Sequence, residues 1–438
     1  MRIAYITAGA AGMFCGSCLR DNTLVTHLRR LGFDALLIPT YTPITTDEAD
    51  ASEKQVFLGG INVYLQDKSW LFRHTPRFLD KLLDASWLLR LAGKRAGSTK
   101  YEDLAGLTLN MLQGTEGHQR KEVLRLADWL VDLAPDVVHL SNALISGVIP
   151  EIHRRLPKAK VVLQLQGDDI FLDAMPPAAR AEIIAQIRRN TAQASGFQST
   201  STAYADAMAT YFGIDRARIH VVLPGIDVDA FRPRQPNPAN PPTLGYFARI
   251  CPEKGFHNAV DAWLALRARP ETKHTRLLAG GWLGAKDKPF FNDQLARIRQ
   301  AGQMDGFEYR DCPTHADKER ILSEMDVFTL PTVYAEPKGL SVLEAWATGV
   351  PAVLPAHGSF PELLEQALLI SAEPGLRYPP GDQEFLVDLL SRLLLHPTEA
   401  AELGHHGREA VERFFNAPRM AHETAHWYHS LPEPGCPN

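Results

Sequence analysis

The stretch Met325–Ala356, MDVFTLPTVYAEPKGLSVLEAWATGVPAVLPA, contains the signals that decide the fold. Its short apolar run Asp326–Leu330 has the length and β-leaning composition of a buried strand. After a loop with two prolines, the run Ser341–Thr348 predicts a helix of about two turns, which Gly349 ends. A strand, a loop and a helix in this order form half of a parallel unit, so the sequence predicts an α/β fold.

The start of this helix is a candidate anion site. In parallel α/β sheets, ligands lie beyond the carboxyl ends of the strands, where the free N–H groups and the positive end of the next helix face them. Gly339 allows the backbone to approach a phosphate closely, and Lys338 adds a positive charge. The predicted phosphate-binding segment is therefore Lys338, Gly339, Leu340 and Ser341.

Two glutamates, Glu336 and Glu344, lie in the loop and one turn into the helix. From these two positions both side chains can face one ligand. A carboxylate accepts hydrogen bonds from neighbouring hydroxyls, so one glutamate can hold a sugar and the other a ribose. The simpler alternative is a solvated loop charge and a charge on an amphipathic helix. The helix around Glu344 is apolar on nearly every side, and a carboxylate there needs a partner, which favours a ligand-binding role.

The run EPKGLSVLEAWATGVPAVLPAHGSFPELL (Glu336–Leu364) resembles the donor-site signature of retaining glycosyltransferases of the GT-B class, family 4 in particular. The resemblance implies two Rossmann-like α/β/α domains that face an interdomain cleft. It also implies transfer of a sugar from a UDP-, ADP- or GDP-linked donor to an acceptor hydroxyl with retention, without a metal or another cofactor. A nucleotide-sugar epimerase of the same fold and a non-catalytic sugar- or nucleotide-binding protein are the alternatives.

Arg249 and Lys254 follow another predicted strand, earlier in the chain, in TLGYFARICPEKG (Thr243–Gly255). Two cations at the carboxyl end of a strand suit a diphosphate, whose negative charge grows as the glycosidic bond breaks. The alternative is a pair of solvated loop charges. The segment resembles the family motif G-R-x-x-x-E-K-G. Together with the signature at Glu336–Leu364, this resemblance implies catalytic roles for Arg249, Lys254 and Glu336, with Glu336 at the sugar and Glu344 at the ribose.

The first half begins with the predicted strand Arg2–Thr7, the glycine-rich loop Ala8–Ser17 and a helix from about Leu19 to Leu31. The glycine spacing does not fit the dinucleotide-binding fingerprint, and a tight β–α turn explains the glycines equally well. By resemblance, this loop faces the donor diphosphate, and Gly16 is the candidate for close approach.

Further residues of the first half are candidates for lining the sugar or the acceptor: Arg20, Asn22, His139, Gln166 and Asp168. The family often carries a histidine where this chain has Ser141 or Gln166, so the family's histidine role is not carried over. For His139 the alternative is a satisfied residue at a strand end, and Asp168 is a candidate helix cap.

Cys15 and Cys18 form a C-x-x-C, which in redox proteins often opens a helix. A zinc site would need two more ligands, and the chain has no second cysteine pair of this kind. Small side chains packed under the loop are the alternative to a redox or metal role.

The predicted domain organisation has an acceptor-side domain over residues 1–231 and a donor domain over 243–415, joined by a proline-rich linker at 232–242. A terminal helix at 416–438 is expected to cross back to the first domain. The run QVFLGGINVYLQD predicts a β-hairpin, and a helical insertion follows at about 69–114. This region has a faint similarity to glycogen and starch synthases.

The composition fits a globular protein and excludes several classes. The 438 residues carry 51 acidic and 46 basic side chains, a formal net charge of -5, which argues against a general nucleic-acid binder. Five cysteines in this length do not form a disulfide framework. Without a membrane-spanning run or a signal peptide before the first strand, a cytoplasmic location is expected, with a sugar, lipid or small molecule as acceptor.

Overall fold

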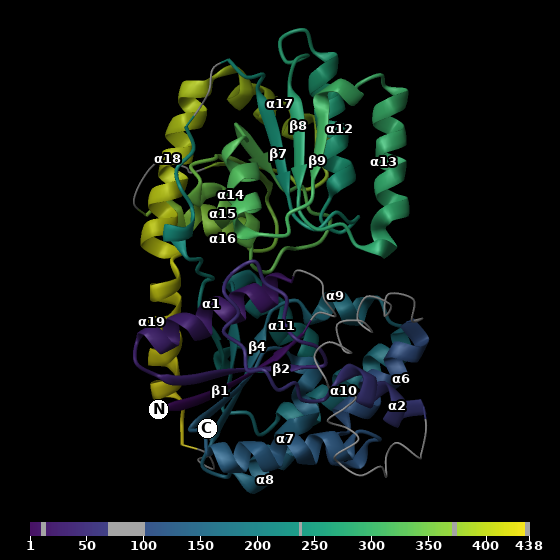
Figure 1. Cartoon of the computed structure of the whole chain (residues 1–438), viewed down its shortest axis with the longest axis vertical. Helices are drawn as coiled ribbons and strands as arrows, with labels where there is room; N and C mark the ends of the chain where they lie inside the picture. The colour runs from purple at the N-terminus through teal and green to yellow at the C-terminus, as the bar shows by residue number, and fades with distance from the viewer. Residues whose placement is uncertain (10–14, 69–100, 236–238, 370–374, 434–438) are drawn as a thin grey trace. The chain divides into compact units, whose positions relative to one another are not determined.

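The computed structural model describes residues 1–9, 15–68, 101–235, 239–369 and 375–433. By its internal contacts the chain divides into two compact units, and each is described by itself (Figure 1). Unit 1 comprises Met1–Leu223 together with Met420–Asn438, and unit 2 comprises Pro224–Arg419. Each unit is an α/β structure around one parallel sheet, so the predicted fold class is confirmed.

Unit 1 contains a six-stranded parallel sheet in the order β2-β1-β3-β4-β5-β6. The pairing of Ile3 with both Ala35 and Val137 places β1 between β2 and β3. The strands are β1 (Arg2–Ala8), β2 (Asp34–Thr40), β3 (Val137–Leu140), β4 (Lys160–Leu165), β5 (Gly196–Ser199) and β6 (Ile219–Val221).

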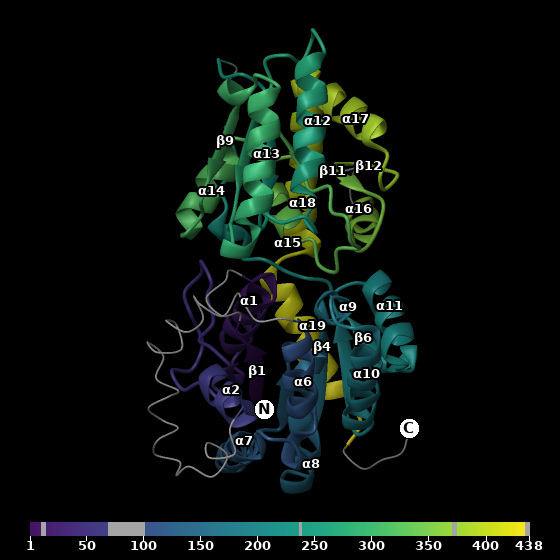
Figure 2. The ribbon, with the colours of Figure 1, turned by 90° about the vertical axis from the view of Figure 1, so that its right-hand side faces the viewer.

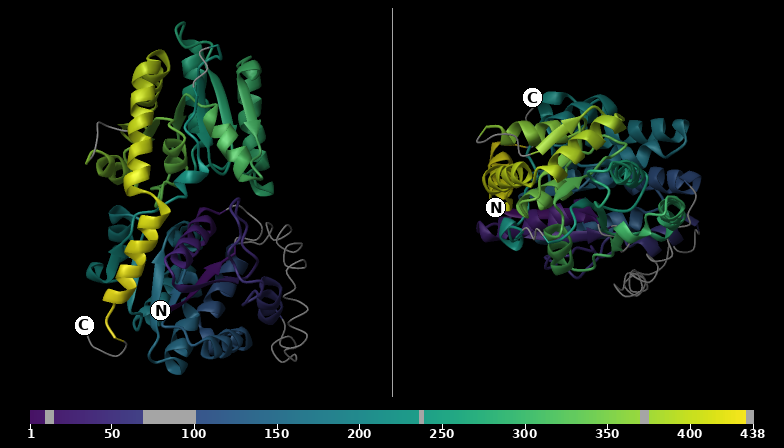
Figure 3. Two further views of the ribbon diagram at one scale, coloured as in Figure 1. Left: turned by 60° about the vertical axis from the view of Figure 1, so that its left-hand side comes forward. Right: turned by 90° about the horizontal axis from the view of Figure 1, so that it is seen from above.

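Helices cover both faces of this sheet. Successive residues of β1 point to opposite faces, so Ala4 and Ile6 enter one apolar core while Ile3 and Tyr5 enter the other. The second core also contains Tyr428 of the terminal helix. This helix, yellow in Figure 3, lies along the same face of the sheet. The helices are α1 (Gly16–Arg30), α2 (Gly60–Lys68), α6 (Tyr101–Leu112), α7 (Arg120–Leu133), α8 (Ile149–Arg155), α9 (Asp168–Asp173), α10 (Pro177–Thr191), α11 (Thr202–Phe212) and α19 (Ala417–Ser430).

Unit 2 repeats this plan with a six-stranded parallel sheet in the order β12-β11-β10-β7-β8-β9. Its strands are β7 (Thr243–Phe247), β8 (Arg276–Gly280), β9 (Phe307–Arg310), β10 (Val327–Thr329), β11 (Ala352–Pro355) and β12 (Gly375–Tyr378). Among its helices, α12 packs on α13 and α17, and α15 packs on α18 (Figure 2). These helices are α12 (Phe256–Ala268), α13 (Lys288–Gln300), α14 (His315–Ser323), α15 (Leu340–Ala347), α16 (Phe360–Ala367), α17 (Gln383–Leu395) and α18 (Pro397–Phe414).

The strand and helix predicted in the deciding stretch are confirmed as β10 and α15. Gly339 precedes α15 with a φ of 72°, and Gly349 follows it with a φ of 77°. Both values lie in the left-handed region that glycine adopts without a steric penalty. The two glycines therefore set the limits of the helix, as the sequence predicts.

The predicted β-hairpin in QVFLGGINVYLQD is wrong. Phe57 forms only an isolated bridge with Thr40, and α2 begins at Gly60. Val63 and Gln66, one helical turn apart, are both buried, so this segment has a helical rather than an alternating inner face. Packing within unit 1 has overridden the β-propensity of the branched and aromatic residues in this segment. Most of the insertion predicted after it, residues 69–100, lies outside the described residues.

Among the described residues, none of the helices combines the length and hydropathy that a bilayer crossing requires.

Candidate functional site

The loop after β7 carries Arg249 and Lys254, and a buried tyrosine holds its shape. Tyr246, within β7, donates hydrogen bonds from its hydroxyl to the carbonyl oxygens of Arg249 at 3.1 Å and Lys254 at 3.3 Å. The backbone N–H of Val333 donates to the Glu253 carbonyl at 3.0 Å, which joins this loop to the loop after β10. The two loops thus form one continuous surface at the carboxyl ends of adjacent strands.

Gly255 allows these loops to approach each other. Its φ is +72°, and a Cβ added there would lie 1.7 Å from the carbonyl oxygen of Pro331. A backbone oxygen at this distance leaves no room for any side chain. Gly255 also precedes α12, so a change here would move the start of that helix.

We expect Gly255→Ala to destabilise unit 2 far more than the matched variant Gly302→Ala. Gly302 has a similar φ of +68° but nothing within 4 Å of an added Cβ, so it reports the backbone strain alone. That strain costs about 1–2 kcal/mol, and the clash at Gly255 adds to it. Scanning calorimetry of both variants should show at least twice the loss of melting temperature for Gly255→Ala. Equal losses would contradict the close approach of the two loops.

Glu336 lies at the centre of this surface. Its Oε2 accepts a hydrogen bond from Lys254 Nζ at 2.5 Å and another from the Tyr334 hydroxyl at 2.6 Å, and its Oε1 accepts from the Gly339 N–H at 3.4 Å. Burial raises the pKa of Glu336, but the attraction and hydrogen bond of Lys254, with the Tyr334 hydroxyl and the Lys338 charge, outweigh it and lower the pKa to about 2. The carboxylate is therefore ionised at neutral pH.

The backbone of Glu336 is fixed by the loop after β11. The Ser359 N–H donates to the Glu336 carbonyl at 2.7 Å. A Cβ on Gly358 would lie 2.5 Å from the Glu336 nitrogen, so the two segments are in close contact. Three loops, which follow β7, β10 and β11, thus meet at Glu336: the first two contact its carboxylate and the third its backbone.

Positive groups surround this carboxylate. Burial and the Glu336 charge raise the pKa of Tyr334, while the charge of Arg249 opposes the shift, so Arg249 acts on the same cluster. Lys338 is 8% exposed, and Ser341 at the start of α15 is partly exposed. The structure therefore brings together the predicted residues Arg249, Lys254 and Glu336 with the amino end of α15, an arrangement that suits an anion carrying hydroxyl groups.

Glu344 has a protein partner that sequence reasoning missed. Its Oε1 accepts a hydrogen bond from Lys318 Nζ of α14 at 2.7 Å, and both side chains are at least 93% buried. The apolar helix around Glu344 correctly indicated that its carboxylate needs a partner. Lys318 lies 26 positions earlier in the chain, and no local pattern connects the two residues.

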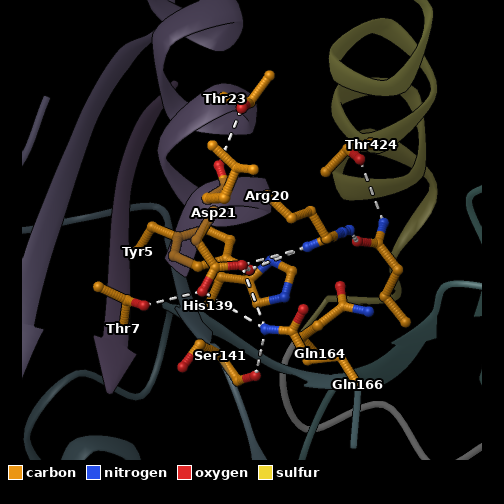
Figure 4. A network of polar contacts seen from close by, with 12 residues as sticks. Tyr5, Thr7, Arg20, Asp21, Thr23, His139, Ser141, Gln164, Gln166 and Thr424 are labelled. Carbon is orange, nitrogen blue, oxygen red and sulfur yellow. Dashed lines mark hydrogen bonds and ion pairs between the residues drawn. The ribbon is translucent and has the colours of Figure 1, made fainter. Parts of the chain in front are cut away.

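In unit 1 a buried carboxylate organises a polar network (Figure 4). Asp21 of α1 accepts hydrogen bonds from the Tyr5 and Thr7 hydroxyls, each at 2.8 Å, and from Gln166 Nε2 at 3.3 Å. Arg20 forms an ion pair with Asp21 at 3.4 Å. Burial raises the pKa of Asp21, although Arg20 and the three donors oppose the shift.

This network accounts for several residues predicted to line a ligand site. The second terminal nitrogen of Arg20 donates to Gln198 at 2.9 Å, and Gln198 donates to Thr424 of α19 at 3.3 Å. His139 Nδ1 lies 2.5 Å from the Tyr428 hydroxyl, and burial lowers the pKa of His139 well below its usual value. These polar contacts join α1 and the sheet to the terminal helix.

The other two predicted lining residues are also buried in unit 1. Asn22 donates to the Ala49 carbonyl at 3.0 Å, and Asp168 accepts from the Ala143 N–H at 2.7 Å. Burial raises the pKa of Asp168 to about 6. The side chains of Arg20, Asn22, His139, Gln166 and Asp168 are thus all buried within unit 1, and their contact with a ligand stays a prediction.

Gly16 and the C-x-x-C lie at the amino end of α1. Gly16 is exposed as the first residue of this helix. Cys15 is partly exposed and Cys18 is buried, and the Cys18 Sγ lies 3.4 Å from the Ala8 carbonyl oxygen. In the described part of the chain, histidine, cysteine and acidic side chains form no group suited to a metal ion.

Comparisons with known proteins agree with this architecture. The family model for glycosyl transferases group 1 matches residues 227–410, and that for the glycosyl transferase 4-like domain matches residues 22–225. The α-maltose-1-phosphate synthase of Mycolicibacterium smegmatis is 31% identical over 52% of this chain and 60% of its own length. A glycogen synthase of Mycobacterium tuberculosis is 27% identical over 74% of this chain and 72% of its own.

Solved structures match almost the whole chain. The sucrose-phosphate synthase of Thermosynechococcus elongatus superposes with a TM-score of 0.69 at 17% identity and covers 98% of both chains. HepE of Anabaena in complex with UDP-glucose superposes with a TM-score of 0.65 at 15% identity, over 98% of this chain and all of HepE. The expected GT-B fold and the similarity to glycogen synthases are confirmed. The matched part spans less than two-thirds of the length of the M. smegmatis relative. The two family models together span nearly all of this chain, which belongs to the family 4 (group 1) glycosyltransferases.

Proposed function

We propose that this protein is a retaining glycosyltransferase that moves a sugar from a nucleoside diphosphate sugar to an acceptor hydroxyl. The observation that carries the proposal is the cluster of Lys254, Glu336 and the amino end of α15 in unit 2. It combines fixed positive charge for a diphosphate with a buried, ionised carboxylate for sugar hydroxyls. Family membership and the complex of HepE with UDP-glucose support this class of donor.

The chemistry requires stabilisation of a departing diphosphate. The bond between the anomeric carbon and the diphosphate oxygen breaks, and Arg249, Lys254 and the N–H groups of Gly339–Ser341 stabilise the charge that develops on this oxygen. The acceptor oxygen bonds to the anomeric carbon on the face that the diphosphate leaves, and the departing phosphate oxygen takes the acceptor proton. Glu336 orients the sugar through its hydroxyls, and Glu344, held by Lys318, accepts hydrogen bonds from the ribose.

A thermal-shift comparison tests the donor site. Purified protein is titrated with UDP, ADP, GDP and their glucose conjugates, alongside Lys254→Ala and the control Lys273→Ala, which removes an exposed lysine elsewhere in unit 2. A ligand at 100 times its dissociation constant stabilises the folded state by about 2.7 kcal/mol.

We expect one nucleotide, with UDP as the first candidate, to stabilise the wild type and Lys273→Ala to the same extent. The stabilisation of Lys254→Ala should be at most a third of that value. If no nucleotide stabilises the wild type, or if Lys254→Ala responds fully, the proposed donor site is wrong.

A further inference from the structure

Unit 2 contains a cavity of about 490 Å³ that the proposed function does not use. Its volume falls within the range of small-molecule sites. The lining comes from the segment before β7, from the turns before β10 and β11, and from α17 and α18.

This cavity lies at the opposite edge of the sheet from the proposed donor site. Pro242, Asp326 and Pro351 come directly before β7, β10 and β11, whereas the donor-site loops follow the same three strands. Because these strands are parallel, their amino ends share one edge of the sheet and their carboxyl ends share the other. The cavity is therefore a separate site on the same unit.

Two arginines line the cavity. Arg234 pairs with Asp326 and donates to the Met325 carbonyl, while its Nε is buried without a partner in the described part of unit 2. Arg408 donates through Nη1 to the carbonyl oxygens of Phe231 and Ala347. Its Nε pairs with Glu412, which does not line the cavity, so Asp326 is the one carboxylate among the described lining residues, beside Arg234 and Arg408.

The rest of the lining is mainly apolar. Leu393, Leu394 and Ala400 are at most 7% exposed but contribute to the wall, together with the prolines that precede the strands. An apolar wall with a few placed polar groups favours a ligand that has a hydrocarbon body and one charged end. Guanidinium groups select a carboxylate or a phosphate as that end, because their forked donors match its oxygens.

The cavity also contacts the carboxyl end of α15. Arg408 donates to the Ala347 carbonyl at this end, and the Arg234 N–H donates to the Thr348 carbonyl at 2.8 Å. The amino end of the same eight-residue helix carries Gly339–Ser341 of the proposed donor site. A ligand that binds Arg408 would therefore act on α15, whose amino end lies at the proposed diphosphate site.

We propose that this cavity binds a small anion with an apolar body, a carboxylate or a phosphate ester, and that the bound anion alters donor affinity through α15. The effect on the donor rests on the proposed function, whereas the binding site itself does not. The closing experiment therefore measures the two separately.

Binding is tested by calorimetric titration of the full chain with hexanoate and hexyl phosphate. Two controls are titrated in the same way: hexanol has the hydrocarbon body without the charge, and inorganic phosphate has the charge without the hydrocarbon body. Ala401→Trp places a bulky side chain at an exposed lining position of α18, and Thr398→Trp adds the same side chain at an exposed position of α18 that does not line the cavity.

We expect at least one of the two anions to bind the wild type and Thr398→Trp with equal affinity. Binding should be at least tenfold weaker for Ala401→Trp and for both controls. If neither anion binds, or if Ala401→Trp binds it as the wild type does, the cavity is not the site. Equal binding of hexanol would overturn the role of the arginines.

The effect on the donor is tested by titrating UDP with and without a saturating amount of the anion that binds. A change of at least fivefold in UDP affinity is expected, and it should be lost in Ala401→Trp. An unchanged affinity would contradict the effector role. If UDP does not bind the wild type at all, the proposed donor site fails together with the effector role, and the anion titration alone decides the cavity site.

Discussion

Replacing Lys254 with alanine is expected to lower the rate of UDP release from UDP-glucose at saturating donor by about 10²–10³, the cost of removing one group that stabilises developing charge. Lys254 Nζ lies 2.5 Å from Glu336 and is 16% exposed, so its charge is fixed and still reaches the surface. In the proposed reaction this charge is needed most when the diphosphate leaves. The loss should therefore appear in kcat as well as in KM.

Two controls separate this effect from a loss of folding. Lys273→Ala, which removes an exposed lysine of unit 2, should retain the wild-type rate. Lys254→Arg keeps a positive charge and should lose less activity than Lys254→Ala. All rates are measured well below the melting temperature of each variant, because Lys254→Ala leaves Glu336 buried without its cationic partner. A rate for Lys254→Ala within threefold of the wild type would show that Lys254 does not stabilise the leaving group.

The second large effect is expected at the buried pair of Lys318 and Glu344. Replacing Glu344 with leucine leaves the Lys318 ammonium buried without this carboxylate, which typically costs about 3–5 kcal/mol. For a unit of this size, each kcal/mol lowers the melting temperature by about 2–4 °C. Calorimetry of Glu344→Leu should therefore show a fall on the order of 10 °C, with a similar fall for Lys318→Met.

The double variant Lys318→Met/Glu344→Leu distinguishes the structural role of the pair from ligand binding. Two apolar side chains of similar size should recover most of the lost stability, since replacing both members of a buried ion pair is often neutral. If Glu344 also holds the ribose, the stable double variant should still bind UDP at least tenfold more weakly than the wild type. Recovery of both stability and UDP affinity would show that Glu344 serves only the fold.

The sequence by itself determined the parts of the protein that depend on local patterns. The order of strand, loop and helix around Glu336, and the glycines that limit α15, follow from apolar runs and backbone preferences. Lys254 and Glu336 were identified separately, by their positions after two strands. Neighbouring parallel strands then bring them to 2.5 Å.

Only the tertiary structure decided which polar groups are partners across long separations. Glu344 was expected to need a partner, but Lys318 is supplied by the packing of another helix. Arg20 and His139 are predicted to line a ligand site, and long-range packing with β5 and the terminal helix buries both. The helix at Gly60–Lys68 also formed against its local β-propensity. In each case the outcome depends on which surfaces meet in the folded units, and this information does not lie in any short stretch of the chain.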